Sequence, residues 1–170
     1  MSTFEHKQEA PRHVSCKVIT VSDTRTENTD KSGQLMVRLL KDAGHQISDY
    51  VIVKDDTGFI KTEVLKGCHH PETDIVLING GTGIAVRDVT IETIKPLFDK
   101  EISGFGELFR MLSYQEDIGS AALLSRAIAG VVVNTAVFST PGSTGAVQLA
   151  MKKLILPELG HVVRELKKDL

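Results

Sequence analysis

Polar runs follow four stretches of aliphatic and β-branched residues in this sequence, and their residue types suit the binding of phosphate and a divalent cation. They combine hydroxyls, carboxylates and closely spaced glycines: Ser22-Asp23-Thr24, Asp55-Asp56-Thr57-Gly58, Gly80-Gly81-Thr82-Gly83 and Thr140-Pro141-Gly142-Ser143. A glycine-rich backbone turns without Cβ clashes and can bring N–H groups close to an anion. Mg²⁺ on phosphates takes one or two carboxylates and keeps several waters. The four runs together predict a metal–phosphate site.

The run Gly80–Gly83 has two interpretations. It can cradle an anion at the start of a helix, or it can be a tight strand-to-helix turn without a ligand. No Gly-Lys-Ser/Thr follows it, so it is not a Walker loop. The third glycine of the dinucleotide fingerprint is also missing, which disfavours a nicotinamide enzyme.

Charged residues near these runs also have two interpretations, one as ligand-binding groups and one as purely structural groups. Asp88 lies near a helix start, where an aspartate often caps the helix or complements its dipole, but it could also bind Mg²⁺. Asp55 and Asp56 are adjacent, so only one of them is expected to point into a site. Arg126 could bind a phosphate in a forked geometry or lie on the surface, and the spacing does not decide between them.

Composition excludes several classes of function. The chain has 170 residues with Lys+Arg 20 and Asp+Glu 22, a net charge of −2, which disfavours a general nucleic-acid surface. No apolar run approaches the roughly 18 residues of a membrane span, and the first residues lack a signal-peptide core. Cys16 and Cys68 lie in apolar patterns and are expected to be buried free thiols, which fits a reducing cytoplasm. A Gly-x-Ser-x-Gly elbow and zinc-ligand spacing are absent from the sequence.

The elements that must position these residues alternate between strand and helix. Strands are predicted at 16–21, 47–53, 75–78, 129–133 and 136–139, the last two an antiparallel pair joined at Asn134-Thr135. Helices are predicted after the cap Ser32, over 59–68, 90–97, 105–112 and 121–127, after Ser143 until Pro157 breaks the helix, and over 159–166. This order predicts an α/β fold with a mostly parallel, mixed sheet covered on both faces. In such folds ligands bind outside the carboxyl ends of the strands.

Four separated motifs resemble one known family. LINGGTGIAVRDVT (77–90), GFGELFRMLSY (104–114), LLSRAIAG (123–130) and FSTPGSTGAV (138–147) are similar to the MoaB/Mog family of molybdenum cofactor biosynthesis proteins, and closest to its MoaB branch. VSDT (21–24) and VKDD (53–56) fit the same family. The resemblance implies a three-layer α/β/α sandwich formed by one molybdopterin-binding-like domain over residues 14–170. Residues 1–13 are expected to form a flexible N-terminal arm.

The resemblance also implies roles for individual residues. Asp55 and Asp88 match the carboxylates associated with Mg²⁺ and adenylyl transfer. The segments around the nucleotide correspond to Gly80, Gly81, Thr82, Gly83, Pro141, Gly142 and Ser143. The polar positions near the pterin and its phosphate correspond to Ser22, Asp23, Thr24, Ser113 and Ser125.

The function implied by the resemblance is molybdopterin binding, with Mg-ATP used to adenylylate the molybdopterin phosphate. A non-catalytic molybdopterin carrier or scaffold is the alternative. Mog-type members usually have Pro-Gly-Asn-Pro where this chain has Pro-Gly-Ser-Thr, whereas the intact Arg87-Asp88-Val89-Thr90 run favours activity. The family also implies a homotrimer or homohexamer. The composition and the cysteines predict a cytoplasmic protein without nucleic-acid or membrane partners.

Overall fold

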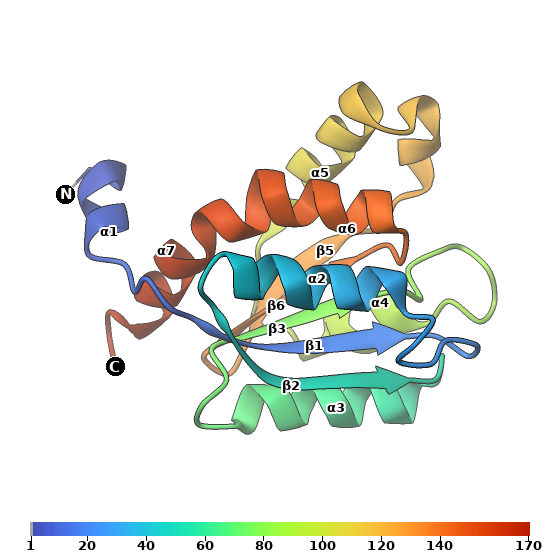
Figure 1. Cartoon of the computed structure of the whole chain (residues 1–170), viewed down its shortest axis with the longest axis horizontal. Helices are drawn as coiled ribbons and strands as arrows, with labels where there is room; N and C mark the ends of the chain where they lie inside the picture. Colours follow the sequence, from blue (N-terminus) through green and yellow to red (C-terminus); the bar gives the residue numbers. More distant parts are fainter. Residues whose placement is uncertain (1) are drawn as a thin grey trace.

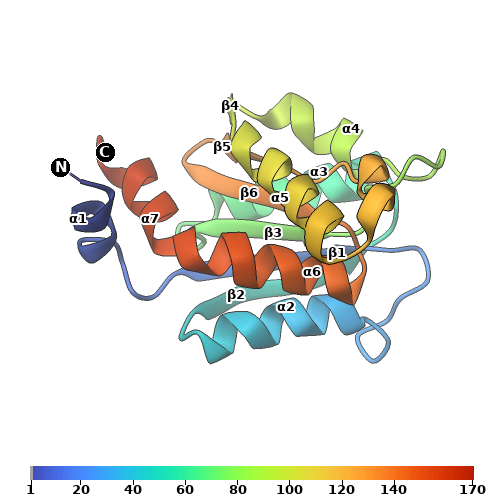
Figure 2. The same ribbon diagram turned by 90° about the horizontal axis from the view of Figure 1, so that it is seen from above.

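A single mixed sheet forms the centre of the molecule in this computed structural model, which describes residues 2–170. Its six strands lie in the order β2-β1-β3-β6-β5-β4 (Figures 1 and 2). The bounds are β1 Ser15–Val21, β2 Gln46–Val53, β3 Ile75–Asn79, β4 Lys100–Glu101, β5 Ile128–Val132 and β6 Thr135–Thr140. Strands β2, β1, β3 and β6 run parallel, while β5 is antiparallel to both of its neighbours. The predicted mixed, mostly parallel sheet is therefore confirmed.

Helices cover both faces of this sheet. Figures 1 and 2 show α2, α5, α6 and α7 over one face and α3 and α4 over the other. The helical segments are α1 Thr3–Gln8, α2 Lys31–Asp42, α3 Thr57–His69, α4 Thr90–Ile94, η1 Lys95–Leu97, α5 Ser103–Glu116, η2 Gly119–Leu124, α6 Thr144–Ala150, η3 Met151–Ile155 and α7 Leu156–Lys167. The result is the expected three-layer α/β/α sandwich. No helix in residues 2–170 combines the length and the apolar character needed to cross a bilayer.

The core is split into two layers by the alternation of side chains along the strands. Val18 of β1 packs into the layer under α2, α5, α6 and α7, together with Phe109 of α5. Its neighbour Ile19 packs into the opposite layer, against Ile60 of α3. Parallel strands buried on both faces must be apolar at nearly every position, which explains the continuous aliphatic runs in the sequence. Both cysteines are buried free thiols, as predicted.

Two predicted helix ends are wrong, for local reasons. Asp30, rather than Ser32, caps α2 by accepting a hydrogen bond from the Gly33 N–H at 3.1 Å. Pro157 does not break the helix that begins at Thr144, because the π-helical turn Met151–Ile155 precedes it and α7 continues from Leu156. A widened turn shifts the backbone hydrogen bonding and makes room for a proline ring. Pro96 does end α4 in a 3₁₀ turn, as expected.

Three smaller features also differ from the prediction. Residues 121–127, predicted as a helix, form only the 3₁₀ segment η2 up to Leu124 and then become extended. The turn between β5 and β6 lies at 133–134, one residue earlier than predicted, and Val133 adopts a φ of 58° there. The two-residue strand β4 pairs with β5 and was not predicted.

The N-terminal segment contacts the last helix. Figure 2 shows α1 beside α7 at one end of the molecule. Lys7 forms an ion pair with Glu158, and Arg164 with Glu9 at 2.7 Å. Each of these pairs is partly exposed and so contributes little stability. The flexibility of residues 1–13 stays a prediction.

Candidate functional site

A cavity of about 570 Å³ lies at the edge of the sheet where the parallel strands β1, β2, β3 and β6 end. Most of the predicted site residues line it. They are Ser22, Asp23, Thr24, Asp55, Gly80, Gly81, Thr82, Gly83, Asp88, Ser125, Pro141 and Gly142. The convergence follows from topology, because the carboxyl ends of parallel strands meet at one edge.

Ser143 and Ser113 do not line this cavity. The exposed Ser143 caps α6, since its Oγ accepts a hydrogen bond from the Ala146 N–H at 3.1 Å. Ser113 is 2% exposed within α5. Its carbonyl accepts hydrogen bonds from the N–H groups of Asp117 and Ile118 at the end of that helix. Their contacts with nucleotide and pterin stay predictions.

The two adjacent aspartates after β2 have different roles. Asp55 lines the cavity, and its backbone N–H donates to Asp23 Oδ1 at 3.1 Å. Asp56 caps α3, because its Oδ1 accepts from the N–H groups of Gly58 at 2.9 Å and Phe59 at 3.2 Å. The geometry thus selects Asp55 as the inward-facing residue of the pair.

The charges around Asp55 make its ionised form costly. Desolvation raises the pKa of this carboxyl, and the negative charges of Asp23 and Asp88 raise it further. Asp23 behaves in the opposite way: its hydrogen bond from Arg87 lowers its pKa. The Arg87 Nε donates to Asp23 Oδ2 at 2.7 Å. A cation close to Asp55 and Asp88 would relieve this repulsion.

The glycine run adopts a backbone that needs glycine at its first two positions. Gly80 has a φ of 97° and Gly81 a φ of 67°. Thr90, the first residue of α4, fixes this turn: its Oγ1 donates to the Gly80 carbonyl at 2.9 Å and its N–H to the Gly81 carbonyl at 3.0 Å. A Cβ on Gly81 would lie 2.2 Å from Thr90 Oγ1 and 3.0 Å from Asp55 Oδ1. The run is therefore packed directly against the candidate metal-binding carboxylate.

Arg126 holds the loop that follows the glycine run. Its Nε donates to the Thr82 carbonyl at 3.1 Å, and its Nη2 donates to the carbonyls of Gly83 and Asp88. Glu92 of α4 forms an ion pair with the same guanidinium. The Arg126 guanidinium is therefore used in contacts within the protein, and it links the loop after the glycine run to the segment after η2.

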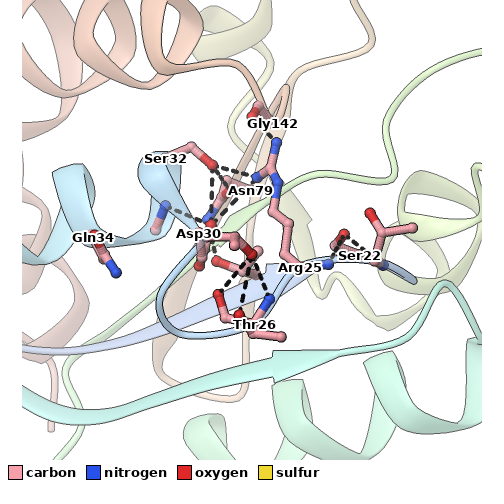
Figure 3. A network of polar contacts seen from close by, with 12 residues as sticks. Ser22, Arg25, Thr26, Asp30, Ser32, Gln34, Asn79 and Gly142 are labelled. Atoms are coloured by element: carbon pink, nitrogen blue, oxygen red, sulfur yellow. Dashed lines mark hydrogen bonds and ion pairs between the residues drawn. The ribbon is translucent and has the colours of Figure 1, made fainter.

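Arg25 is a cavity residue that the sequence did not single out. Figure 3 shows its side chain reaching from the β1–α2 loop to Ser32 and Gly142. The only sequence signal was its position directly after Ser22-Asp23-Thr24. The partners that fix it become visible only in the folded chain.

The donor set fits a cation that arrives with phosphate, rather than a site made by protein ligands alone. Residues 2–170 contain no cluster of three or more His, Cys, Asp or Glu side chains arranged to hold a metal ion. Asp55 and Asp88 supply two carboxylates to the cavity, and Mg²⁺ bound to phosphates needs only one or two. In addition, the buried Oγ of Ser125 has no hydrogen-bond partner in the described part of the chain, although it belongs to a cavity-lining residue. A ligand in the cavity would supply one.

Comparison with known proteins shows the family. Residues 17–161 match the family described as "Probable molybdopterin binding domain". The Molybdenum cofactor biosynthesis protein B of Bacillus subtilis is 69% identical over 169 residues, covering 99% of both chains. The chain belongs to the MoaB/Mog family of molybdenum cofactor biosynthesis proteins. This membership supports a role in molybdenum cofactor biosynthesis.

Solved structures of MoaB/Mog proteins have the same architecture. A crystal structure of Molybdenum cofactor biosynthesis protein B superposes with a TM-score of 0.91 at 63% identity, covering 94% of this chain and 99% of that one. The tungsten cofactor synthesizing protein MoaB from Pyrococcus furiosus gives a TM-score of 0.83 at 40% identity, covering 93% and 99%. A MogA structure at 24% identity, with a TM-score of 0.80, supports the fold alone.

Proposed function

We propose that this protein binds molybdopterin and adenylylates its phosphate with Mg-ATP. The observation that carries the proposal is the meeting of Asp55, Asp88 and the Gly80–Gly83 run around one cavity. These residues come from the ends of β2 and β3 and from the loop before α4. Membership of the MoaB/Mog family supports molybdopterin as the substrate.

The proposed reaction joins two phosphate groups. An oxygen of the molybdopterin phosphate attacks the α-phosphorus of ATP in line. A new P–O bond forms there while the bond to the β-phosphate oxygen breaks, so pyrophosphate leaves and adenylylated molybdopterin remains. A phosphate nucleophile is already ionised near pH 7, so the site needs no strong general base. The cavity lining accordingly supplies carboxylates, hydroxyls and backbone N–H groups, but no histidine among the described residues.

Asp88 and Asp55 are the residues that would hold Mg²⁺. When bound, the ion neutralises charge on the triphosphate and on the departing pyrophosphate. The protein's own contribution is to fix the positions of these two carboxylates. Asp88 Oδ2 accepts a hydrogen bond from the Ala85 N–H at 3.0 Å, and the Asp55 backbone is tied to Asp23.

Backbone and hydroxyl groups would hold the phosphates. The left-handed turn at Gly80 and Gly81 lets the backbone approach an anion closely. Ser22 and Ser125 add hydroxyls on the side assigned to the pterin substrate. Charge-assisted hydrogen bonds of this kind are about twice as strong as neutral ones.

The test is an adenylyl-transfer assay with purified protein, molybdopterin, Mg²⁺ and ATP, following pyrophosphate and the adenylylated product. Asp88→Asn should lower kcat by at least about 100-fold, since loss of charge stabilisation worth about 2.7 kcal/mol has that effect. The exposed Asp42 of α2 provides a matched control, and Asp42→Asn should turn over like the wild type. If Asp88→Asn turned over as fast as the wild type, Asp88 would have no role in catalysis. Molybdopterin binding without any turnover in the wild type would identify a carrier instead.

A further inference from the structure

Arg25 is chemically unlike its neighbours in the cavity. Among the described residues that line the cavity, it carries the single positively charged side chain, whereas Asp23, Asp55 and Asp88 are acidic. Two phosphate-bearing substrates would add several more negative charges to this space. A fixed cation in the wall would therefore have a large effect on their binding.

The guanidinium is fixed by groups from three parts of the chain. Its Nη1 donates to Ser32 Oγ at 2.5 Å, and Nη1 lies 3.4 Å from Asp30 Oδ1. Its Nη2 donates to the Gly142 carbonyl at 2.7 Å (Figure 3). The Arg25 backbone N–H donates to Ser22 Oγ at 3.1 Å, which fixes the loop at the same point. The side chain thus spans the β1–α2 loop, the start of α2 and the β6–α6 loop.

The partners of Arg25 are themselves held rigidly. Asp30 is fully buried, and its second oxygen accepts a hydrogen bond from Tyr50 Oη at 2.6 Å. Ser32 is 1% exposed and donates to Asn79 Oδ1 at 2.7 Å. Because the network already holds the Arg25 side chain in one rotamer, binding a ligand costs less side-chain entropy than it would for a freely moving arginine.

Part of the donor capacity of Arg25 is left over. A guanidinium has five N–H donors, and the hydrogen bonds above engage Nη1 and one hydrogen of Nη2. Within residues 2–170, Nε and the second hydrogen of Nη2 have no partner in the structure. The side chain is 31% exposed and lines the cavity. Each free N–H of a guanidinium can donate a charge-assisted hydrogen bond to a phosphate oxygen.

We propose that Arg25 binds a phosphate group of the substrates and holds it opposite the carboxylates Asp55 and Asp88. This inference rests on the proposed function and adds a substrate-binding residue to it. The ligand class is a phosphate ester or phosphoanhydride. Arg25 lies between Ser22–Thr24 and Gly142, the segments assigned to the pterin phosphate and to the nucleotide. Both sources of phosphate therefore need to be tested.

A purely structural role for Arg25 makes a different prediction. If its only task were to link the loops, then weakening the same network from outside the cavity would have the same effect on ligand binding. Tyr50 permits that comparison, because it touches Asp30 but does not line the cavity. Arg38 of α2 is exposed and controls for the loss of one positive charge.

The experiment measures binding by titration calorimetry for wild type, Arg25→Met, Tyr50→Phe and Arg38→Met, with Mg-ATP, inorganic pyrophosphate and molybdopterin as separate ligands. Arg25→Met should raise Kd by about 10- to 100-fold for at least one ligand, as expected for a hydrogen bond to a charged group. The ligand with the larger loss identifies the source of the phosphate. The Arg38→Met protein should bind within twofold of the wild type, and Tyr50→Phe, which loosens the network but keeps the guanidinium, should lose clearly less affinity than Arg25→Met.

Unchanged affinity of Arg25→Met for all three ligands would overturn the proposal, as would an equal loss in Tyr50→Phe. If Arg25→Met does not fold, Arg25→Lys replaces it, because a single ammonium cannot bridge Ser32, Gly142 and a phosphate at once. Affinity of Arg25→Lys equal to wild type would also overturn the proposal. The two proposals can also fail separately. If the wild type binds these ligands but transfers no adenylyl group, while Arg25→Met binds them more weakly, then adenylylation is refuted and the role of Arg25 in phosphate binding is upheld.

Discussion

The substitution Gly83→Ala should separate catalysis from stability. A Cβ built on Gly83 would lie 2.5 Å from Asp88 Oδ2 and 3.1 Å from its Cγ. The neighbouring atoms belong to the end of a side chain, which can rotate away. Gly83 itself does not have a positive φ, so alanine fits its backbone. The expected result is a folded protein whose Asp88 carboxylate has moved.

The size of each effect can be worked from the same contacts. Replacing a glycine where the backbone permits alanine stabilises a protein by about 0.4–1 kcal/mol through the unfolded state. Moving Asp88 costs its hydrogen bond from the Ala85 N–H, and because this bond is exposed and both groups regain water, the loss is about 0.5–1.5 kcal/mol. The free energy of unfolding should therefore change by less than about 1 kcal/mol. A displacement of about 1 Å in a reacting group can reduce turnover by about 100-fold.

Two other glycines give matched controls. Gly80→Ala places a Cβ 2.3 Å from the Val21 carbonyl oxygen at a φ of 97°. Backbone cannot rotate away as a side chain can, and the strained φ adds about 1–3 kcal/mol, so the total loss should exceed about 3 kcal/mol. Gly104→Ala in α5 has nothing within 4 Å and should be neutral or stabilising.

The assays are denaturant unfolding and adenylyl transfer on the three variants and the wild type. Gly83→Ala should unfold like the wild type but turn over about 100-fold more slowly. Wild-type turnover by Gly83→Ala would refute the claim that the position of the Asp88 carboxylate matters. A loss of stability as large as that of Gly80→Ala would refute the distinction between flexible and rigid neighbours.

Further predictions concern charge, thiols and backbone strain. Because the folded pKa of Asp55 is raised, its contribution to stability is complete below the unfolded pKa of about 3.9 and is lost as the pH rises through the folded value. Asp55→Asn should therefore have a higher Tm than the wild type at pH 7 and no advantage near pH 3.5, in thermal melts at both values. Burial raises the pKa of Cys68 to about 12 and also raises that of Cys16, so neither thiol should react with an aromatic disulfide at pH 8 until the protein is denatured. Val133→Gly should raise the free energy of unfolding by about 1 kcal/mol in urea titrations, because a β-branched residue at a φ of 58° is strained.

The sequence predicted the sheet well because its signals there are long and redundant. Continuous aliphatic runs such as 75–78 are typical of parallel strands buried on both faces, and the order of elements then decides which ends converge. The meeting of Asp55, Asp88 and Gly80–Gly83 at one edge followed from this topology alone. The topology does not decide whether Asp55 or Asp56 faces the cavity, because either aspartate could have capped α3.

The predictions failed where the folded chain departs from a local rule. A proline usually ends a helix, but one widened turn before Pro157 is enough to let the helical chain continue as α7. The alanine- and leucine-rich segment 121–127 favours a helix by propensity. In the structure the 3₁₀ segment η2 ends at Leu124, and the chain after it is extended. The extended backbone allows Arg126 to reach the carbonyls of Thr82 and Gly83. Similarly, Arg25 gained significance only from Ser32 and Gly142, which are distant from each other in sequence.

Two features that cost folding free energy gather around the cavity. The ionised form of Asp55 is disfavoured, and the buried Ser125 Oγ lacks a partner. The other buried hydroxyl without a partner in the described chain, that of Ser139, lies in β6 and does not line the cavity. A ligand in the cavity would relieve both, by neutralising the charge of Asp55 and by giving the Ser125 hydroxyl a partner. Mg-ATP should therefore raise the Tm, since a ligand at 100 times its Kd adds about 2.7 kcal/mol, and the rise should be smaller in Asp55→Asn, in which a cation has less charge to neutralise.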